Sequence, residues 1–125
     1  NDDLMLQART VSFSDLCLNV ASSMTIHCAI TGTKVLSPAF DHVEGLPYHE
    51  SVRRVYDYEH NRKMHELGFV KVVNRRADFI GAVRGALDAP LDEMARQRVL
   101  EDYAGTVDGQ AAERLALSVL RELTA

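Results

Sequence analysis

The sequence predicts an α/β fold, a Rossmann-like parallel sheet with flanking helices, and two observations lead to this prediction. Three short apolar runs, "LCLNV", "KVLSPAF" and "FVKVV", have the length and composition of strands that are buried on both faces. The segments between and after these runs carry apolar residues at helical spacing. Strands that alternate with helices are typical of parallel sheets, because parallel neighbours need a crossover connection between them.

The first strand is expected over residues 16–20 and the first crossover helix directly after it, beginning at Met24. Ser22 or Ser23 can cap this helix, because a hydroxyl just before the first turn accepts a hydrogen bond from a backbone N–H there. Gly32 is placed to end the helix, since glycine readily adopts the left-handed conformation that follows a last helical turn.

The second strand is expected over residues 34–40, and the Gly, Pro and two His of residues 41–50 indicate a loop. Residues 51–68 are polar and predict one or two helical stretches, the last ending at Gly68. Residues 69–73 follow as the third strand.

Three further helices are expected after the third strand. Residues 77–90 form an amphipathic pattern with Phe79, Ile80, Val83 and Leu87 on its apolar face, and Pro90 closes it. Residues 91–105 and 109–125 predict two more helices, separated by the turn "TVDG". The apolar residues of the last helix are expected to pack in the core; they are Leu115, Leu117, Val119 and Leu120.

A sheet of three strands is thin for a fold of this class, which usually has five or six strands. We therefore expect residues 1–125 to form a single Rossmann-like domain that lacks upstream strands, the C-terminal part of a larger domain.

Composition and charge narrow the class of protein. The 14 basic and 18 acidic residues give a net charge of −4, whereas nucleic-acid-binding proteins carry a clustered basic excess. No apolar run approaches the roughly 20 residues that span a bilayer, and no secretory signal pattern is present. Cys17 and Cys28 do not have the spacing of metal ligands and are expected to be reduced core residues. We therefore expect a cytoplasmic protein with no nucleic-acid partner and no transmembrane segment.

The sequence lacks the motifs of several common chemistries. There is no GxGxxG, no GxxxxGK[ST] and no GxSxG, so dinucleotide, P-loop and hydrolase functions have no support. No HExxH or related spacing appears among the histidines. We expect neither a resident cofactor nor a metal.

The strand-to-helix junction at Ser22 and Ser23 is a candidate phosphate site. Ligands of open α/β sheets bind beyond the carboxyl ends of the strands, and helix N-termini there offer N–H groups and a positive dipole end to phosphate oxygens. The alternative is structural, in which one serine only caps the helix.

Three other residues are candidate ligand contacts. His27, one turn into the same helix, can form a hydrogen bond to a ribose or phosphate, or it is an ordinary surface residue. Arg53 and Arg54 can pair with phosphates through their planar guanidinium groups, or they belong to a solvated helix with mixed charges.

Taken in order, "NVASSMTIHCAITGTKVLSPAFD", "YDYEHNRK" and "ADFIGAVRGALDAPLDEMARQRVLEDYAGTVDGQAAERL" resemble the C-terminal end of GT-B-type glycosyltransferases. The pattern is most similar to bacterial surface-carbohydrate biosynthesis proteins and to CDP-glycerol glycerophosphotransferase-like enzymes. The resemblance covers roughly residues 12–118.

The resemblance implies two Rossmann-like domains that face a cleft, of which this chain is the C-terminal one. It places Ser22 and Ser23 at the phosphates of a nucleotide-activated sugar or polyol donor, and His27 where such families carry Asp or Glu for ribose contact. The acceptor would be a carbohydrate, and the missing N-terminal domain would be a partner that supplies the catalytic base. The catalytic residues are thus unknown from this chain, which alone would be inactive, and the parent protein would be peripheral to the inner face of the membrane.

Two alternatives remain open. One is a non-catalytic Rossmann-like interaction domain with a degenerate donor site, which the histidine at position 27 favours. The other is an enzyme of the UDP-sugar 2-epimerase type, which shares the GT-B architecture.

Overall fold

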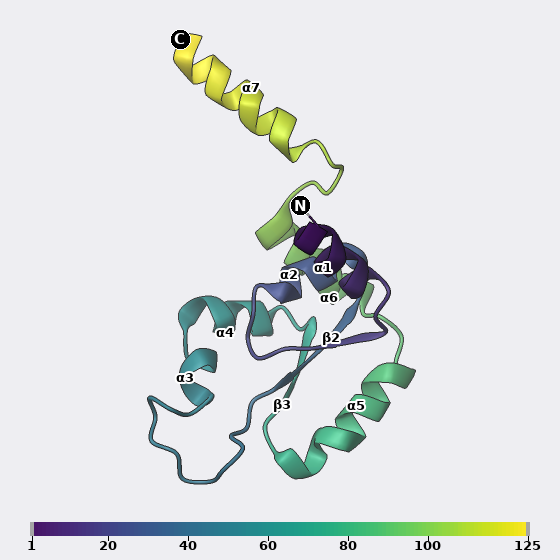
Figure 1. The fold of residues 1–125 in the computed structure, drawn as a ribbon, viewed down its shortest axis with the longest axis vertical. Helices are drawn as coiled ribbons and strands as arrows, with labels where there is room; N and C mark the ends of the chain where they lie inside the picture. The colour runs from purple at the N-terminus through teal and green to yellow at the C-terminus, as the bar shows by residue number, and fades with distance from the viewer. Residues whose placement is uncertain (1, 125) are drawn as a thin grey trace.

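The computed structural model describes residues 2–124, in which three parallel strands form a sheet with helices on both of its faces (Figure 1). The elements are α1 (Asp2–Ser12), β1 (Leu16–Leu18), α2 (Met24–Thr31), β2 (Lys34–Pro38), α3 (Arg53–Tyr56), α4 (Glu59–Glu66), β3 (Val70–Val73), the 3₁₀ turn η1 (Arg76–Asp78), α5 (Phe79–Asp88), α6 (Glu93–Val99), the π-helical turn η2 (Leu100–Ala104) and α7 (Ala111–Thr124). The predicted Rossmann-like α/β fold is confirmed.

The strands follow one another across the sheet in the order β1-β2-β3, all parallel. Leu16 pairs with Lys34, and Val35 pairs with Val70, so β2 is the central strand. β1 lies at an edge of this sheet, and Leu18 at its end is 52% exposed, whereas the sequence predicted a fully buried strand.

Two apolar clusters cover the two faces of the sheet. Val35 and Leu36 are adjacent in β2 and point to opposite faces, as successive residues of a strand do. Val35 belongs to the larger cluster, to which α1, α2, α4 and α6 contribute, and Leu36 belongs to the smaller one, which α5 covers. The helices of the larger cluster hold the first crossover against the sheet, and this fixes the turn between β1 and α2.

Both cysteines are free thiols in the core region, Cys28 fully buried and Cys17 partly buried. Burial, with a further contribution from neighbouring Cys17, raises the pKa of the Cys28 thiol to about 12. Because the thiolate is the reactive form, Cys28 is an unreactive packing residue.

One sequence-based expectation about helix packing is wrong in part, a second is wrong, and one helix was missed. On α5, Phe79 and Val83 pack against the smaller cluster as predicted, whereas Ile80 is 61% exposed and Leu87 is also exposed. Ala82 and Ala86 complete the buried face of this helix. The expected packing of Leu115, Leu117, Val119 and Leu120 is wrong, because α7 extends away from the sheet and buries none of its residues (Figure 1). The unpredicted helix is α1, in which Val11 alone is buried.

No helix within residues 2–124 is long and apolar enough to cross a membrane.

Candidate functional site

The turn between β1 and α2 has a constrained backbone at the carboxyl end of β1. Ala21 has a φ of 41°, in the left-handed region that residues with a side chain rarely adopt. Ser37 of β2 holds this turn, since its Oγ accepts a hydrogen bond from the Ala21 N–H at 3.3 Å and donates one to the Asn19 carbonyl oxygen at 2.7 Å. Ser37 is fully buried in the central strand, so its two hydrogen bonds tie the turn to the sheet.

Tyr56, the last residue of α3, extends this network. Its hydroxyl lies 2.7 Å from Ser37 Oγ and donates to the Pro38 carbonyl oxygen at 2.8 Å. Its ring stacks on the imidazole of His65, with ring centroids 5.2 Å apart. Burial raises the pKa of Tyr56, so its hydroxyl stays neutral and keeps the single proton that it donates to the Pro38 carbonyl oxygen.

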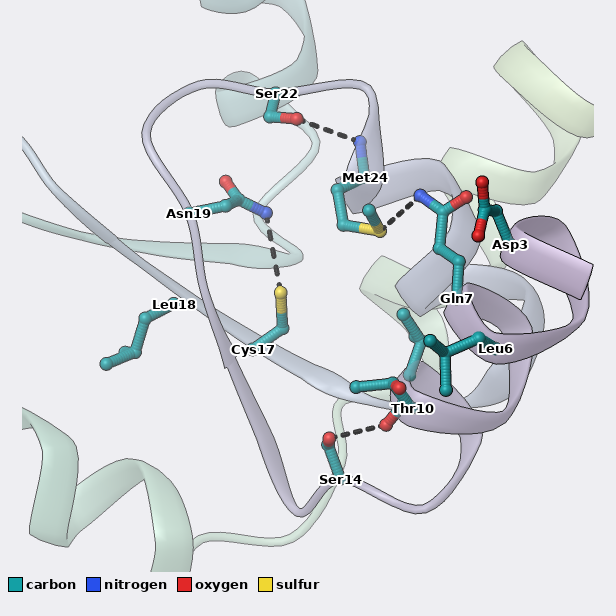
Figure 2. Close-up of a pocket in the computed structure, with 11 residues that line it drawn as sticks. Asp3, Leu6, Gln7, Thr10, Ser14, Cys17, Leu18, Asn19, Ser22 and Met24 are labelled. Carbon is teal, nitrogen blue, oxygen red and sulfur yellow. Dashed lines mark hydrogen bonds between the residues drawn. The ribbon is translucent and has the colours of Figure 1, made fainter.

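The two serines of the turn have different roles in the structure. Ser22 Oγ accepts a hydrogen bond from the Met24 N–H at 3.1 Å, so it satisfies the first N–H of α2 from one residue before the N-cap (Figure 2). Ser23 occupies the N-cap position but makes no side-chain capping hydrogen bond. The Ser23 hydroxyl is therefore available to a ligand at the N-terminus of α2.

Both serines line a pocket of about 280 Å³, which we call the serine pocket. Its lining residues are Ala21, Ser22, Ser23, Thr25, Ile26, His60, Asn61, Met64, His65 and Tyr103. Burial lowers the pKa of His65, so at neutral pH its imidazole is uncharged and offers one donor and one acceptor. The polar groups of the pocket are thus hydroxyls, an amide and imidazoles, which can bind the oxygens of an anionic or hydroxylated ligand.

Ser22 also lies at the edge of a second, apolar hollow of about 570 Å³ on the other side of the turn (Figure 2). Figure 2 shows α1 contributing Leu6, Gln7 and Thr10 to this groove, opposite Leu18 of β1. Its lining is mostly apolar, and Gln7 Nε2 donates its one hydrogen bond there to the Met24 sulfur at 3.7 Å. The turn therefore lies between the serine pocket and this groove, and Ser22 lines both.

A third hollow, of about 800 Å³, lies at the carboxyl ends of β2 and β3. We call it the arginine cleft because three arginines line it, Arg53, Arg75 and Arg76. The loop after β2 and the segment that joins β3 to α5 form its walls.

The structure brings together two of the five residues predicted from the sequence. Ser22 and Ser23 share the serine pocket, whereas His27 is exposed on α2 and is not among its lining residues. Arg53 lines the arginine cleft, and Arg54 is exposed and lines neither site. The ligand contacts of all five residues stay predictions.

Sequence reasoning did not find His65 and Tyr103, which belong to the serine pocket. The dense run of His, Tyr and charged residues before Gly68 was the available signal for His65. No signal was available for Tyr103, which comes from the π-helical turn η2 far along the chain. Among residues 2–124, no group of three or more His, Cys, Asp or Glu side chains is arranged to hold a metal ion.

Fold and site together define a Rossmann-like α/β unit with a pocket, lined in part by hydroxyl, amide and imidazole groups, at the carboxyl end of its first strand. Comparisons of the chain with models of protein families, with curated proteins and with solved structures find no match. Arguments about function therefore depend on the geometry of the site.

Proposed function

We propose that the serine pocket binds the phosphates of a nucleotide-activated sugar or polyol donor. The chain would be the donor-binding part of a GT-B-like glycosyltransferase or glycerophosphotransferase that acts on a carbohydrate acceptor. The observation that carries the proposal is the position of Ser23, at the junction of β1 and α2 with a hydroxyl that makes no capping bond. This is the edge of an open α/β sheet at which ligands bind.

The chemistry of the pocket supports a phosphate ligand. The N-terminus of α2 presents a positive dipole end, and the Ser23 hydroxyl adds a donor beside it. Neutral His65 supplies a further donor that does not need protonation. No arginine or lysine lines the pocket, so these neutral donors carry the recognition of the anion.

The contribution to catalysis would be electrostatic. As the donor bond breaks, negative charge grows on the departing nucleotide diphosphate, and donors fixed around it stabilise that charge more than they stabilise the ground state. The network of Ser37 and Tyr56 holds the turn in place before the ligand arrives, so little reorganisation is needed.

Titration of the chain with UDP, CDP and GDP, followed by backbone amide chemical shifts, tests the proposal. We expect saturable shifts at residues 21–25 with at least one of the three. Ser23→Ala should weaken that binding by about tenfold, because one hydrogen bond to a charged oxygen is lost. Ser12→Ala is the matched control, since this exposed serine of α1 bonds only to the Ala8 carbonyl oxygen. A folded chain whose residues 21–25 do not respond to millimolar nucleotide would contradict the proposal.

A second candidate is a non-catalytic interaction domain with a degenerate donor site. Two observations favour it: Ser22 Oγ already accepts a hydrogen bond from the Met24 N–H, and His27 lies outside the serine pocket. Under this alternative the same titration gives no response, although the chain is folded.

A further inference from the structure

The arginine cleft has the size and position of a ligand site that is separate from the serine pocket. Its volume of about 800 Å³ lies in the range of small-molecule sites, roughly 300–1,000 Å³. It opens at the carboxyl ends of β2 and β3, the edge at which open α/β sheets bind ligands. None of its lining residues is shared with the serine pocket.

Two of the three guanidinium groups in the cleft have no carboxylate partner. Arg75 is neutralised, since its Nε lies 2.7 Å from Asp78 Oδ2. Arg76 makes only a long contact, 3.5 Å, from Nη1 to the His42 carbonyl oxygen. Arg53 forms no ion pair with any residue in the described part of the chain. Arg53 and Arg76 thus line one hollow with guanidinium groups that form no ion pair among residues 2–124.

Asp41 lines the same cleft, but both of its carboxylate oxygens already accept hydrogen bonds. Its Oδ2 accepts a hydrogen bond from Ser51 Oγ and its Oδ1 accepts one from the Val52 N–H, both at 2.7 Å. The hydrogen bond from the Val52 N–H, and to a lesser degree that from Ser51, lowers the pKa of Asp41. Asp41 therefore stays ionised, and both of its oxygens accept hydrogen bonds. Asp41 therefore fixes the start of α3, and with it the position of Arg53, instead of pairing with this arginine.

The remaining lining favours a small organic molecule with one anionic group. Phe40 packs edge-on against Phe79, with ring centroids 5.6 Å apart, and gives the cleft an apolar wall. The amide of Asn74 can bind hydroxyl groups, and Glu44 is the other carboxylate of the lining besides Asp41. With Arg75 paired to Asp78, the free donors of the lining are the guanidinium groups of Arg53 and Arg76, and the oxygens of Asp41 are already in use.

We propose that the arginine cleft binds the phosphate group of a small phosphorylated molecule between Arg53 and Arg76. The planar fork of a guanidinium matches the oxygens of a phosphate with two parallel hydrogen bonds, and two such forks suit a doubly charged phosphate monoester. The site goes beyond the proposed donor function, since it uses other residues and does not require the serine pocket to be occupied.

The test is a titration of the full chain with inorganic phosphate and with glycerol 1-phosphate, at constant ionic strength, followed by backbone amide and arginine Nε–H signals. We expect saturable shifts at Arg53 and at residues 74–78, with glycerol 1-phosphate binding more tightly because the cleft has room for its carbon chain. Signals of residues 21–25 report the serine pocket separately, so failure of one site is distinguishable from failure of the other.

Arg53→Gln and Arg76→Gln should each weaken the binding of glycerol 1-phosphate by about tenfold, because each removes a charge-assisted pair of hydrogen bonds. Arg62→Gln is the matched control, since Arg62 is exposed on α4, carries the same charge and does not line the cleft. Equal weakening by all three substitutions would show general attraction of anions to the surface and would overturn the proposal. The absence of saturable shifts around the cleft with millimolar phosphate compounds would also overturn it.

Discussion

Tyr56 shapes the serine pocket although it does not line it. Its hydroxyl joins Ser37, which holds the strained turn at Ala21, and its ring supports His65, which does line the pocket. One side chain thus positions both walls of the pocket, the turn after β1 and the outer helix α4. Tyr56 is therefore a positioning residue.

Replacement of Tyr56 by Phe keeps the ring stacked on His65 but removes the hydroxyl. The Pro38 carbonyl oxygen then loses its donor, so we expect a loss of about 1–2 kcal/mol in the free energy of unfolding. Urea denaturation measures this loss. Tyr58→Phe is the control, because Tyr58 is 44% exposed and its hydroxyl makes no hydrogen bond within residues 2–124. An equal loss in both variants would contradict the role given to Tyr56.

At the scale of elements, the loop between β2 and α3 is closed by a single carboxylate. Asp41, at the start of this loop, accepts hydrogen bonds from the Ser51 hydroxyl and the Val52 N–H at the end of the loop. These two bonds hold the ends of residues 42–50 together. This closure sets where α3 begins, and hence where Arg53 and Tyr56 lie.

Closure by Asp41 makes stability depend on pH. The pKa of Asp41 is lower in the folded chain than in the unfolded one, so its contribution is complete above the ordinary aspartate pKa, about 3.9, and is lost as the pH falls through the lower folded value. Asp41→Asn should therefore lower the urea midpoint at neutral pH, and the gap from the natural chain should close as the pH falls below about 3.9. Asp15→Asn, which removes a carboxylate with no hydrogen bond among the described residues, should show no such gap. A gap of constant size across this range would contradict the assignment.

The sequence predicted the elements better than it predicted their contacts. The three strands were found because short apolar runs and glycine or proline breaks are local signals, and each observed strand lies within its predicted run. The turn at Ser22 and Ser23 was found for the same reason. The support from Tyr56 was not predictable, because Tyr56 and Ser37 meet only after α3 packs back onto the sheet. The exposed face of α5 was misjudged because alanines, and not the larger Ile80 and Leu87, approach the sheet.

For the whole molecule, α7 is a helix of 14 residues that contains no buried residue. Every residue of it that the structure describes is exposed, including Leu115, Val119 and Leu123, which recur at helical spacing on one side. The segment after Gly105 carries the helix away from the sheet (Figure 1). The stability of the α/β unit should therefore not depend on α7.

A chain that ends after Gln110 should unfold in urea with the same midpoint and the same dependence on denaturant as the full chain. The reason is that both quantities follow the surface exposed on unfolding, to which α7 adds little. Removal of residues 1–12 is the contrasting variant. It deletes buried Val11, whose carbonyl oxygen accepts a hydrogen bond from Thr33 Oγ1 at 2.7 Å, and should lower the midpoint. A lower midpoint for the chain without α7 would contradict this picture.

The strand order β1-β2-β3 has a consequence for how the chain reaches its structure. Each strand joins the outer edge of a sheet made by the strands before it, and no strand has to insert between two others. Parallel strands pair slowly, because a long connection must close before the contacts form. Here each closure involves only the next strand along the chain, so the sheet can grow in the order in which the ribosome delivers its strands.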